Sequence, residues 1–257
     1  MNNIKEIYES RNILKAMVVK NLFGHYRSSA LGFAWHFIVP AIMMFVYYIV
    51  FTQIRSNPIP EFWIFLASGL FPFNFMTSNL SGGSGCIVNN SGMVKKMYFP
   101  REIIVLAQVI STFIVMLIGY SIIMAAIIFS GYPLTWAISM LPLIMMVMFA
   151  FVTGYVLILS ALTVYVRDIQ HFIGSITMMF FFMTPMYFTM DSVTGLLSTV
   201  VKINPFSYFV ESFHQIVYYG TMPELEIVAM CLMIATLSMT IGIMTFTKLK
   251  RGFVERL

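Results

Sequence analysis

The sequence predicts an all-α, polytopic membrane protein with six transmembrane helices. Hydrophobic residues make up 60% of its 257 residues and charged residues only 10%, whereas soluble domains average about 45–50% and about 25%. Several apolar stretches are continuous and reach the roughly 20 residues that a spanning helix needs, without the alternation of a transmembrane β-barrel. This composition excludes an ordinary soluble enzyme, a disordered protein and a nucleic-acid-binding module.

Six stretches are long and apolar enough to form the predicted spans. The third and fourth share one uncharged stretch that is too long for a single helix across a bilayer. The sequence SGYP at 130–133 supplies the turn that divides this stretch. The predicted spans are 33–54, 62–82, 103–129, 136–165, 169–190 and 227–247.

The Lys and Arg residues predict the orientation of these spans, because cytoplasmic loops are enriched in them. Six spans leave both termini on one side. Arg55 and Lys202 fall on the opposite side. We therefore expect both termini to be cytoplasmic, on the side that carries the other thirteen basic residues: Lys5, Arg11, Lys15, Lys20, Arg27, Lys95, Lys96, Arg101, Arg167, Lys248, Lys250, Arg251 and Arg256.

The N-terminal segment 4–26 is not apolar enough to cross the bilayer. Its apolar residues recur at roughly helical spacing, with Lys and Glu between them. This pattern favours a helix that lies in the cytoplasmic interface of the membrane. The alternative is a soluble N-terminal helix packed on the spans.

The segment 191–226 between the last two spans is long but is not a polar loop. Its two apolar parts, 193–201 and 206–219, are separated by Asn204-Pro205, which breaks a helix. Neither part is long enough to span. We expect a re-entrant pair of short helices that dip into the outer leaflet, since helices satisfy their own backbone groups. The alternative is an external amphipathic cap without a role in transport.

The loop 83–101 combines glycine, serine and asparagine residues with a basic, apolar segment. This pattern predicts a short helix capped by Asn or Ser. An exposed apolar and basic surface is typical of a docking site for a cytoplasmic partner. A basic anchor that contacts anionic headgroups is the alternative. The residues that this helix would present are Met93, Val94, Met97 and Tyr98, beside Lys95 and Lys96.

Catalytic and ATP-binding patterns are absent from the sequence. It has no paired carboxylates, no metal-ligand spacing around Cys86 or Cys231, and no Gly-Lys-Ser/Thr of an ATP-binding loop. Energy for active transport would have to come from another polypeptide. Ionisable residues are nearly absent from the middle of the spans: His36, Glu102, Arg167 and Asp168 lie at span edges, and Glu211 and His214 lie in the outer segment.

Four motifs occur in register along the chain: residues 25–35 (HYRSSALGFAW) followed by Pro40, residues 94–102 (VKKMYFPRE), residues 167–169 (RDI), and Asn204-Pro205-Phe206 with Glu211 and Phe213. Together they resemble the type-2 ABC exporter permeases, in particular those that export O-antigen, teichoic acid or capsule polysaccharides. The motifs are similar, in this order, to the entrance to the first span of that family, its cytoplasmic loop, the start of its fifth span and its external segment.

The resemblance implies a single permease domain over residues 1–257. It also implies a bacterial inner (cytoplasmic) membrane location and a homodimer of permeases above two ATP-binding cassette ATPase subunits. This chain would carry no cofactor or metal, and ATP and Mg²⁺ would bind the ATPase subunits. Residues 1–32 would form the interfacial helix and entrance loop, 83–101 the coupling loop and 191–226 the extracytoplasmic segment. The coupling residues would be Met93, Val94, Lys95, Lys96, Met97, Tyr98 and Phe99, and the cytoplasmic turn would contain Arg167 and Asp168.

The resemblance also implies that the substrate is a lipid-linked polysaccharide, whose pyrophosphate would arrive at Arg27, Ser29, Leu31 and Gly32. The chemistry agrees, because a guanidinium binds phosphate in a bidentate manner and glycine permits close backbone approach. A snorkelling membrane anchor is the alternative for Arg27. Sugars stack on aromatic rings, so some of Tyr47, Phe51 and Tyr187 are expected to line the channel.

Two other functions remain open from the sequence. A type-2 permease could export a drug or a small lipid, and a narrower channel would distinguish it. A membrane-embedded glycan-modifying enzyme component would need a polar catalytic cluster at one interface, and the sequence offers none.

Overall fold

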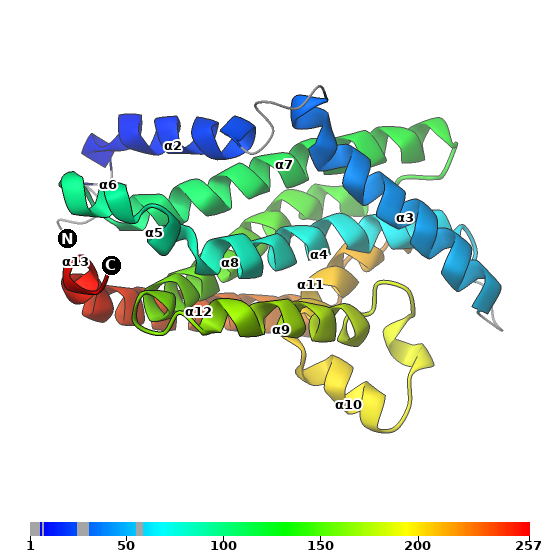
Figure 1. Cartoon of the computed structure of the whole chain (residues 1–257). Coiled ribbons are helices and arrows are strands. Elements are labelled where there is room, and N and C mark those ends of the chain that lie inside the picture. The colour runs from blue at the N-terminus through cyan, green and yellow to red at the C-terminus, as the bar shows by residue number, and fades with distance from the viewer. Residues whose placement is uncertain (1–5, 7, 25–30, 55–58) are drawn as a thin grey trace.

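The structure is a computed structural model, and it describes residues 6, 8–24, 31–54 and 59–257. The regular secondary structure of these residues is entirely helical, which confirms the predicted all-α class. The long helices lie side by side in a bundle, and α3 (Trp35–Ile54) crosses one of its faces (Figure 1).

Among the described residues, four helical stretches are long and apolar enough to cross a membrane: Gly32–Gln53, Glu102–Phe129, Trp136–Tyr165 and Leu225–Arg256. They contain α3, α7 (Glu102–Phe129), α8 (Leu141–Tyr165) and α12 (Leu225–Leu249). These stretches match the first, third, fourth and sixth predicted spans. The predicted turn between the third and fourth is also present, because Gly131 adopts a φ of +77° that favours glycine.

Helix α4 (Phe62–Ser84) covers the second predicted span but is less apolar than the other four. It packs against α3, α7, α8, α9 and α11, and most of its side chains are buried. Its polar side chains are therefore enclosed by other helices. Ser68 donates to the Phe65 carbonyl at 2.8 Å, and the buried amide of Asn79 donates to the Phe75 carbonyl at 2.8 Å and to Thr112 Oγ1 at 2.7 Å.

Helices α8 and α12 run in the same direction and touch through their backbones. The Ser238 hydroxyl donates to the Phe151 carbonyl at 3.0 Å, and further along the Tyr165 hydroxyl donates to the Leu249 carbonyl at 2.9 Å. Between these two contacts Gly154 faces Gly242 so closely that a Cβ on Gly242 would lie 2.4 Å from the Gly154 carbonyl oxygen. Small residues permit such close approach of helices in membranes.

Helix α9 (Ile169–Met183) is shorter than the fifth predicted span, which extended to residue 190. The prediction is wrong beyond Met183 because Pro185 disfavours a helical conformation at Thr184, which has φ −100° and ψ 134°. The Thr184 hydroxyl donates to the Phe180 carbonyl at 2.6 Å and accepts from the Asn204 amide at 2.8 Å. These contacts fix the end of α9 inside the bundle.

The predicted break at Asn204-Pro205 is present. Helix α10 (Leu196–Ile203) ends there, and α11 (Pro205–Phe213) begins and continues as a π-helix over His214–Tyr218. The Asn204 side chain caps α11 by accepting from the Phe206 backbone N–H at 3.0 Å. Phe206 stacks on Phe180 at 4.5 Å and meets Phe151 edge-on at 5.9 Å, so α11 begins among α8 and α9.

Helix α2 (Arg11–Gly24) fulfils the predicted amphipathic pattern of the N-terminal segment. Met17 is buried, and Ile13, Leu14 and Val18 pack against the core. The helix lies beside α7 (Figure 1). The segment is therefore packed on the long helices.

Helices α5 (Cys86–Asn89), α6 (Ser91–Lys96) and α13 (Phe253–Arg256) lie at one end of the bundle (Figure 1). We call it the basic end because it carries Lys95, Lys96, Lys248, Lys250, Arg251 and Arg256. The turn at Gly131 lies at the opposite end, since α7 begins at the basic end and runs away from it.

Candidate functional site

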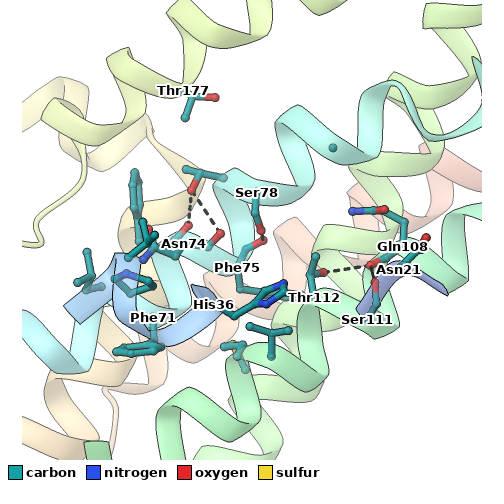
Figure 2. A pocket seen from close by; sticks show the side chains of 18 of the residues that line it. Asn21, His36, Phe71, Asn74, Phe75, Ser78, Gln108, Ser111, Thr112 and Thr177 are labelled. Atoms are coloured by element: carbon teal, nitrogen blue, oxygen red, sulfur yellow. Dashed lines mark hydrogen bonds between the residues drawn. The ribbon is translucent and has the colours of Figure 1, made fainter. Parts of the chain in front are cut away.

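A cavity of about 1110 Å³ lies among α2, α3, α4, α7 and α9 (Figure 2). Its lining extends from Leu70 in α4 to Asn90, which precedes α6 at the basic end. Pockets for drug-sized ligands measure about 300–1,000 Å³. The cavity is therefore large enough for more than one small ring.

The lining of the cavity is more polar than a lipid-facing surface would be. Asn74 and Ser78 come from α4, Gln108 and Thr112 from α7, and Thr177 from α9 (Figure 2). Within the described residues, the side-chain amides of Asn74 and Gln108 have no hydrogen-bond partner. A polar group placed in an apolar medium without a partner costs about 2–7 kcal/mol. These amides therefore require water or a polar ligand in the cavity.

The three aromatic residues predicted to line a channel lie in one cluster. Phe51 stacks on Tyr187 with ring centroids 4.3 Å apart, and Tyr47 lies 5.2 Å from Phe181, which contacts Tyr187 at 5.7 Å. Tyr47, Phe181 and Phe182 line the cavity, whereas Phe51 and Tyr187 continue the cluster beyond it. The cavity thus has an amide-rich part and an aromatic end.

The predicted substrate entrance is described only in part. Arg27 and Ser29 lie outside the described residues. Leu31 is half exposed, and Gly32 opens the turn into α3 with a φ of +45°, a conformation that a side chain would strain. The backbone conformation at position 32 therefore favours glycine.

The predicted short helix in the loop 83–101 is present as α6, but its exposed surface differs from the prediction. Val94 is only 4% exposed and Phe99 only 8%, and Met93 packs against the core. Val94 was expected on the surface, and this is wrong because α6 turns that face towards the bundle. The exposed residues are Met97 at 50% and Tyr98, which is fully exposed, together with Lys95 and Lys96.

The predicted cap of α6 also acts differently. Asn90 is the N-cap residue, but its side chain makes no capping bond. Instead, its amide donates to the Cys86 carbonyl at 2.8 Å, and its oxygen accepts from Lys20 Nζ in α2 at 3.0 Å. Asn90 thus connects the loop to the N-terminal helix.

Arg167 and Asp168 are exposed in the turn between α8 and α9. The preceding Tyr165 contacts the C-terminal segment, because its hydroxyl donates to the Leu249 carbonyl and Arg256 lies 5.8 Å above its ring. The turn therefore lies at the basic end.

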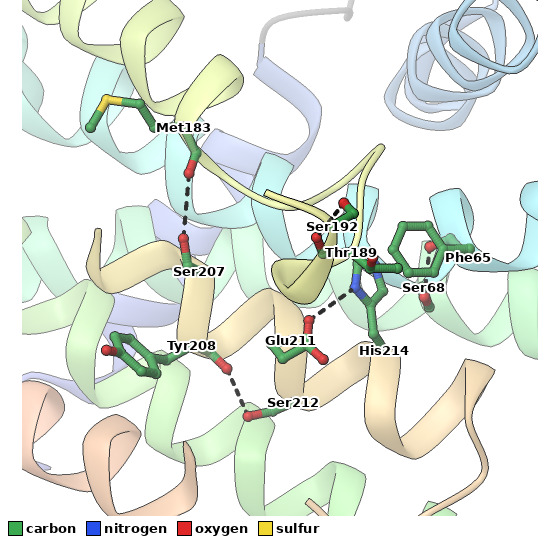
Figure 3. Close-up of polar contacts among 10 residues, drawn as sticks. All are labelled: Phe65, Ser68, Met183, Thr189, Ser192, Ser207, Tyr208, Glu211, Ser212 and His214. Atoms are coloured by element: carbon green, nitrogen blue, oxygen red, sulfur yellow. Dashed lines mark hydrogen bonds and ion pairs between the residues drawn. The ribbon is translucent and has the colours of Figure 1, made fainter. Parts of the chain in front are cut away.

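Glu211 and His214 form a buried polar pair in the segment 205–218 (Figure 3). His214 Nδ1 lies 3.8 Å from a Glu211 carboxylate oxygen, and the His214 ring stacks on Phe65 of α4 at 3.9 Å. Neither ring nitrogen has a hydrogen-bond partner among the described residues. Gly69 makes room for the ring, because a Cβ there would lie 2.7 Å from His214 Nε2.

Sequence reasoning placed Glu211 and His214 in an outer segment and missed their burial inside the bundle. The signal available was their spacing of three residues, which puts both on one face of a helix. Sequence reasoning also missed Asn74 and Gln108. Both could have been noticed as polar amide side chains within predicted spans.

A bundle of long apolar helices around a polar cavity, with an exposed basic loop at one end, is the architecture of a membrane transport subunit. Residues 13–218 match the family described as ABC-2 type transporter, and the chain belongs to this family. It is therefore a multi-pass membrane permease domain without an ATPase domain, and permeases of this family work with a separate ATPase subunit.

Three relatives are described as the O-antigen export system permease protein RfbA. The protein from Myxococcus xanthus is 26% identical over 225 residues, which cover 87% of this chain and 86% of the relative. Two proteins from Klebsiella pneumoniae are 27% and 26% identical over 246 residues, which cover 95% of this chain and 94% of each relative. The resemblance to the polysaccharide export permeases inferred from the motifs is confirmed at the family level.

Proposed function

We propose that this chain is the permease subunit of an ATP-driven exporter that moves a lipid-linked polysaccharide across the bacterial inner membrane. The observation that carries the proposal is the similarity to O-antigen export permeases over nearly the whole chain. A cavity of about 1110 Å³ with amide side chains in its lining and an aromatic end supports it, since sugar hydroxyls form hydrogen bonds with amides and sugar faces stack on rings. Teichoic acid and capsule polysaccharides are the other substrates of this class.

The proposed topology has six spans, with α4 and α9 as the second and fifth, and both termini in the cytoplasm. In it the basic end faces the cytoplasm, as the positive-inside rule favours, and α2 lies at the cytoplasmic interface. Helices α10 and α11 form the re-entrant pair. The burial of Phe206 among α8 and α9 supports this arrangement. The working exporter would be a permease homodimer with two ATPase subunits, which bind ATP and Mg²⁺.

The function is tested by reconstituting the permease with its ATPase subunit in lipid vesicles. We expect ATP-dependent transfer of a lipid-linked polysaccharide from the outer to the inner leaflet of vesicles that expose the ATPase. A fluorescent phospholipid and a small amphiphilic drug serve as competing substrates. Transport of either of these without transfer of the glycan would replace the proposal by a lipid or drug exporter, and chemical modification of the glycan would indicate an enzyme component.

The substrate entrance is proposed to comprise Arg27, Ser29, Leu31 and Gly32. A guanidinium binds pyrophosphate through charge-assisted hydrogen bonds worth about 1.5–3 kcal/mol each. Arg27→Ala should abolish the stimulation of ATP hydrolysis by substrate, and Arg27→Lys should weaken it, because lysine lacks the planar fork. Basal hydrolysis serves as the internal control. A lysine snorkels as well as an arginine, so full stimulation in Arg27→Lys and Arg27→Ala would leave Arg27 as a membrane anchor.

Residues 93–99 are proposed to couple the permease to the ATPase. Met97 and Tyr98 would be the exposed apolar residues that contact the ATPase, and the buried Val94 and Phe99 would support them. Losing an apolar interface anchor typically costs more than about 1 kcal/mol. Met97→Ala combined with Tyr98→Ala should therefore lower export and co-purification of the ATPase about tenfold or more. Phe129→Ala is the matched control, because Phe129 is 90% exposed at the opposite end. Normal export by the double variant would exclude this surface from coupling.

A further inference from the structure

The C-terminal segment 248–257 is attached to the loop that contains Met97 and Tyr98. Lys250 Nζ lies 2.5 Å from Glu102 Oε1, with only 23% and 14% of the two side chains exposed. The Arg101 guanidinium donates to the Lys250 backbone carbonyl. It also lies 5.9 Å above the ring of Phe253. Three separate interactions thus join Arg101 and Glu102 to the end of the chain.

The C-terminal segment is itself anchored in the bundle. Phe253 is fully buried and meets Phe246 of α12 edge-on at 5.6 Å. The Tyr165 hydroxyl donates to the Leu249 carbonyl at 2.9 Å, and Gly252 approaches the same hydroxyl so closely that a Cβ would lie 2.5 Å from it. The segment therefore connects the loop with α12 and with the end of α8.

The contacts of Arg101 and Glu102 lie close enough in the chain to the exposed Met97 and Tyr98 to fix the position of these two residues. Arg101 and Glu102 follow Tyr98 by three and four residues, and Glu102 is the first residue of α7. The turn after Tyr165 leads directly into α9, which lines the cavity with Gly174, Thr177 and Phe181. A displacement of the loop would thus be passed through the C-terminal segment to a wall of the cavity.

We propose that the C-terminal segment holds the coupling loop in the position that the ATPase subunit engages, so that Glu102, Lys250 and Arg101 are positioning residues for coupling. The proposal rests on the role proposed above for residues 93–99. It does not depend on which substrate is exported. The ion pair stabilises the geometry and Phe253 anchors it, while Met97 and Tyr98 contact the partner.

Charge exchange tests this proposal in the full permease with its ATPase. Glu102→Lys and Lys250→Glu each place like charges at a 2.5 Å contact, so each should lower the substrate exported per ATP hydrolysed by about 2- to 30-fold, the range found for residues that carry coupling. The double variant restores opposite charges and should recover most of the loss. Lys248→Glu, at an exposed position of the same segment, is the control for net charge and should retain full coupling.

Two further measurements separate positioning from folding and from the proposed function. The melting temperature in detergent should stay close to that of the wild type in the charge-exchanged double variant, because the opposite charges and the contacts of Phe253 and Tyr165 are kept. If charge reversal prevents membrane insertion, the neutral variants Glu102→Gln and Lys250→Met are used in place of the charge-reversed ones. Each should lower the substrate exported per ATP hydrolysed. Normal coupling in the single variants, or a double variant that is inserted but as uncoupled as they are, would overturn the proposal. If the wild-type protein transported a small lipid in place of a glycan, only the proposed substrate would be refuted.

Discussion

Replacing Gly154 by leucine is expected to leave little correctly folded permease in the membrane. A Cβ at this position would lie 2.4 Å from the backbone carbon of Ser238 and 2.5 Å from the backbone nitrogen of Met239. Backbone atoms cannot rotate away as side chains can, so α8 and α12 would have to separate. Overpacking costs about 1–3 kcal/mol and occasionally more, against a total stability of about 5–15 kcal/mol. We expect the cost in this variant at the upper end of the overpacking range, because the two nearest atoms belong to the backbone of α12.

The measurement is the fraction of protein that elutes as a single species after mild detergent extraction, together with its melting temperature. Gly154→Ala should show an intermediate loss. Gly174→Leu is the matched control, because Gly174 also lies in an apolar helix and a Cβ there would meet no atom within 4 Å. An equal loss in Gly174→Leu would attribute the effect to the leucine itself, and wild-type behaviour of Gly154→Leu would refute the close contact.

Making the cavity apolar should nearly stop export while the protein stays folded. Asn74→Leu and Gln108→Met replace the two amides that lack a partner among the described residues by apolar groups of similar size. Two lost hydrogen bonds of about 0.5–1.5 kcal/mol each correspond to an export rate about 5- to 150-fold lower. Folding should be retained, since neither amide bonds to another described residue.

The initial rate of glycan transfer into reconstituted vesicles measures this effect. Basal ATP hydrolysis should be unchanged, because neither residue belongs to the proposed coupling residues 93–99. Thr236→Val is the control, since Thr236 is an exposed polar residue on α12 outside the cavity. Unimpaired transfer by the double variant would show that the substrate takes another path.

The positions of the long helices could be predicted because hydropathy alone determines which segments leave water. The end of α9 could not, although Pro185 was visible in the sequence. The segment after Pro185 is also apolar, and the hydrogen bond between Thr184 and Asn204 that completes the break joins residues far apart in the chain. The mean hydropathy of a short window of sequence contains no information on a hydrogen-bond partner that lies so far away in the chain.

Residue type alone was enough to select some candidate residues of the site. The side of a helix that faces the bundle could not be predicted in the same way. Aromatic character singled out Tyr47, Phe51 and Tyr187 as candidates for a channel lining. The structure brings the three together, but of them only Tyr47 lines the cavity. The apolar character of Val94 was equally clear, but in so short a helix periodicity does not decide which face packs inward. Asn74 and Gln108 were passed over because their significance depends on the cavity, which several helices far apart in the chain enclose.

Helix α4 has a consequence for how the protein is made. It is less apolar than the other long helices, and it is enclosed by α7, α8 and α11. Polar residues such as Asn74 and Asn79 make insertion of an isolated segment into lipid less favourable. In the six-span topology proposed above, the ribosome delivers α4 before any of these neighbours exists, so α4 would remain beside the insertion machinery or beside α3. Its release into the bilayer is therefore expected to await synthesis of the second half of the chain.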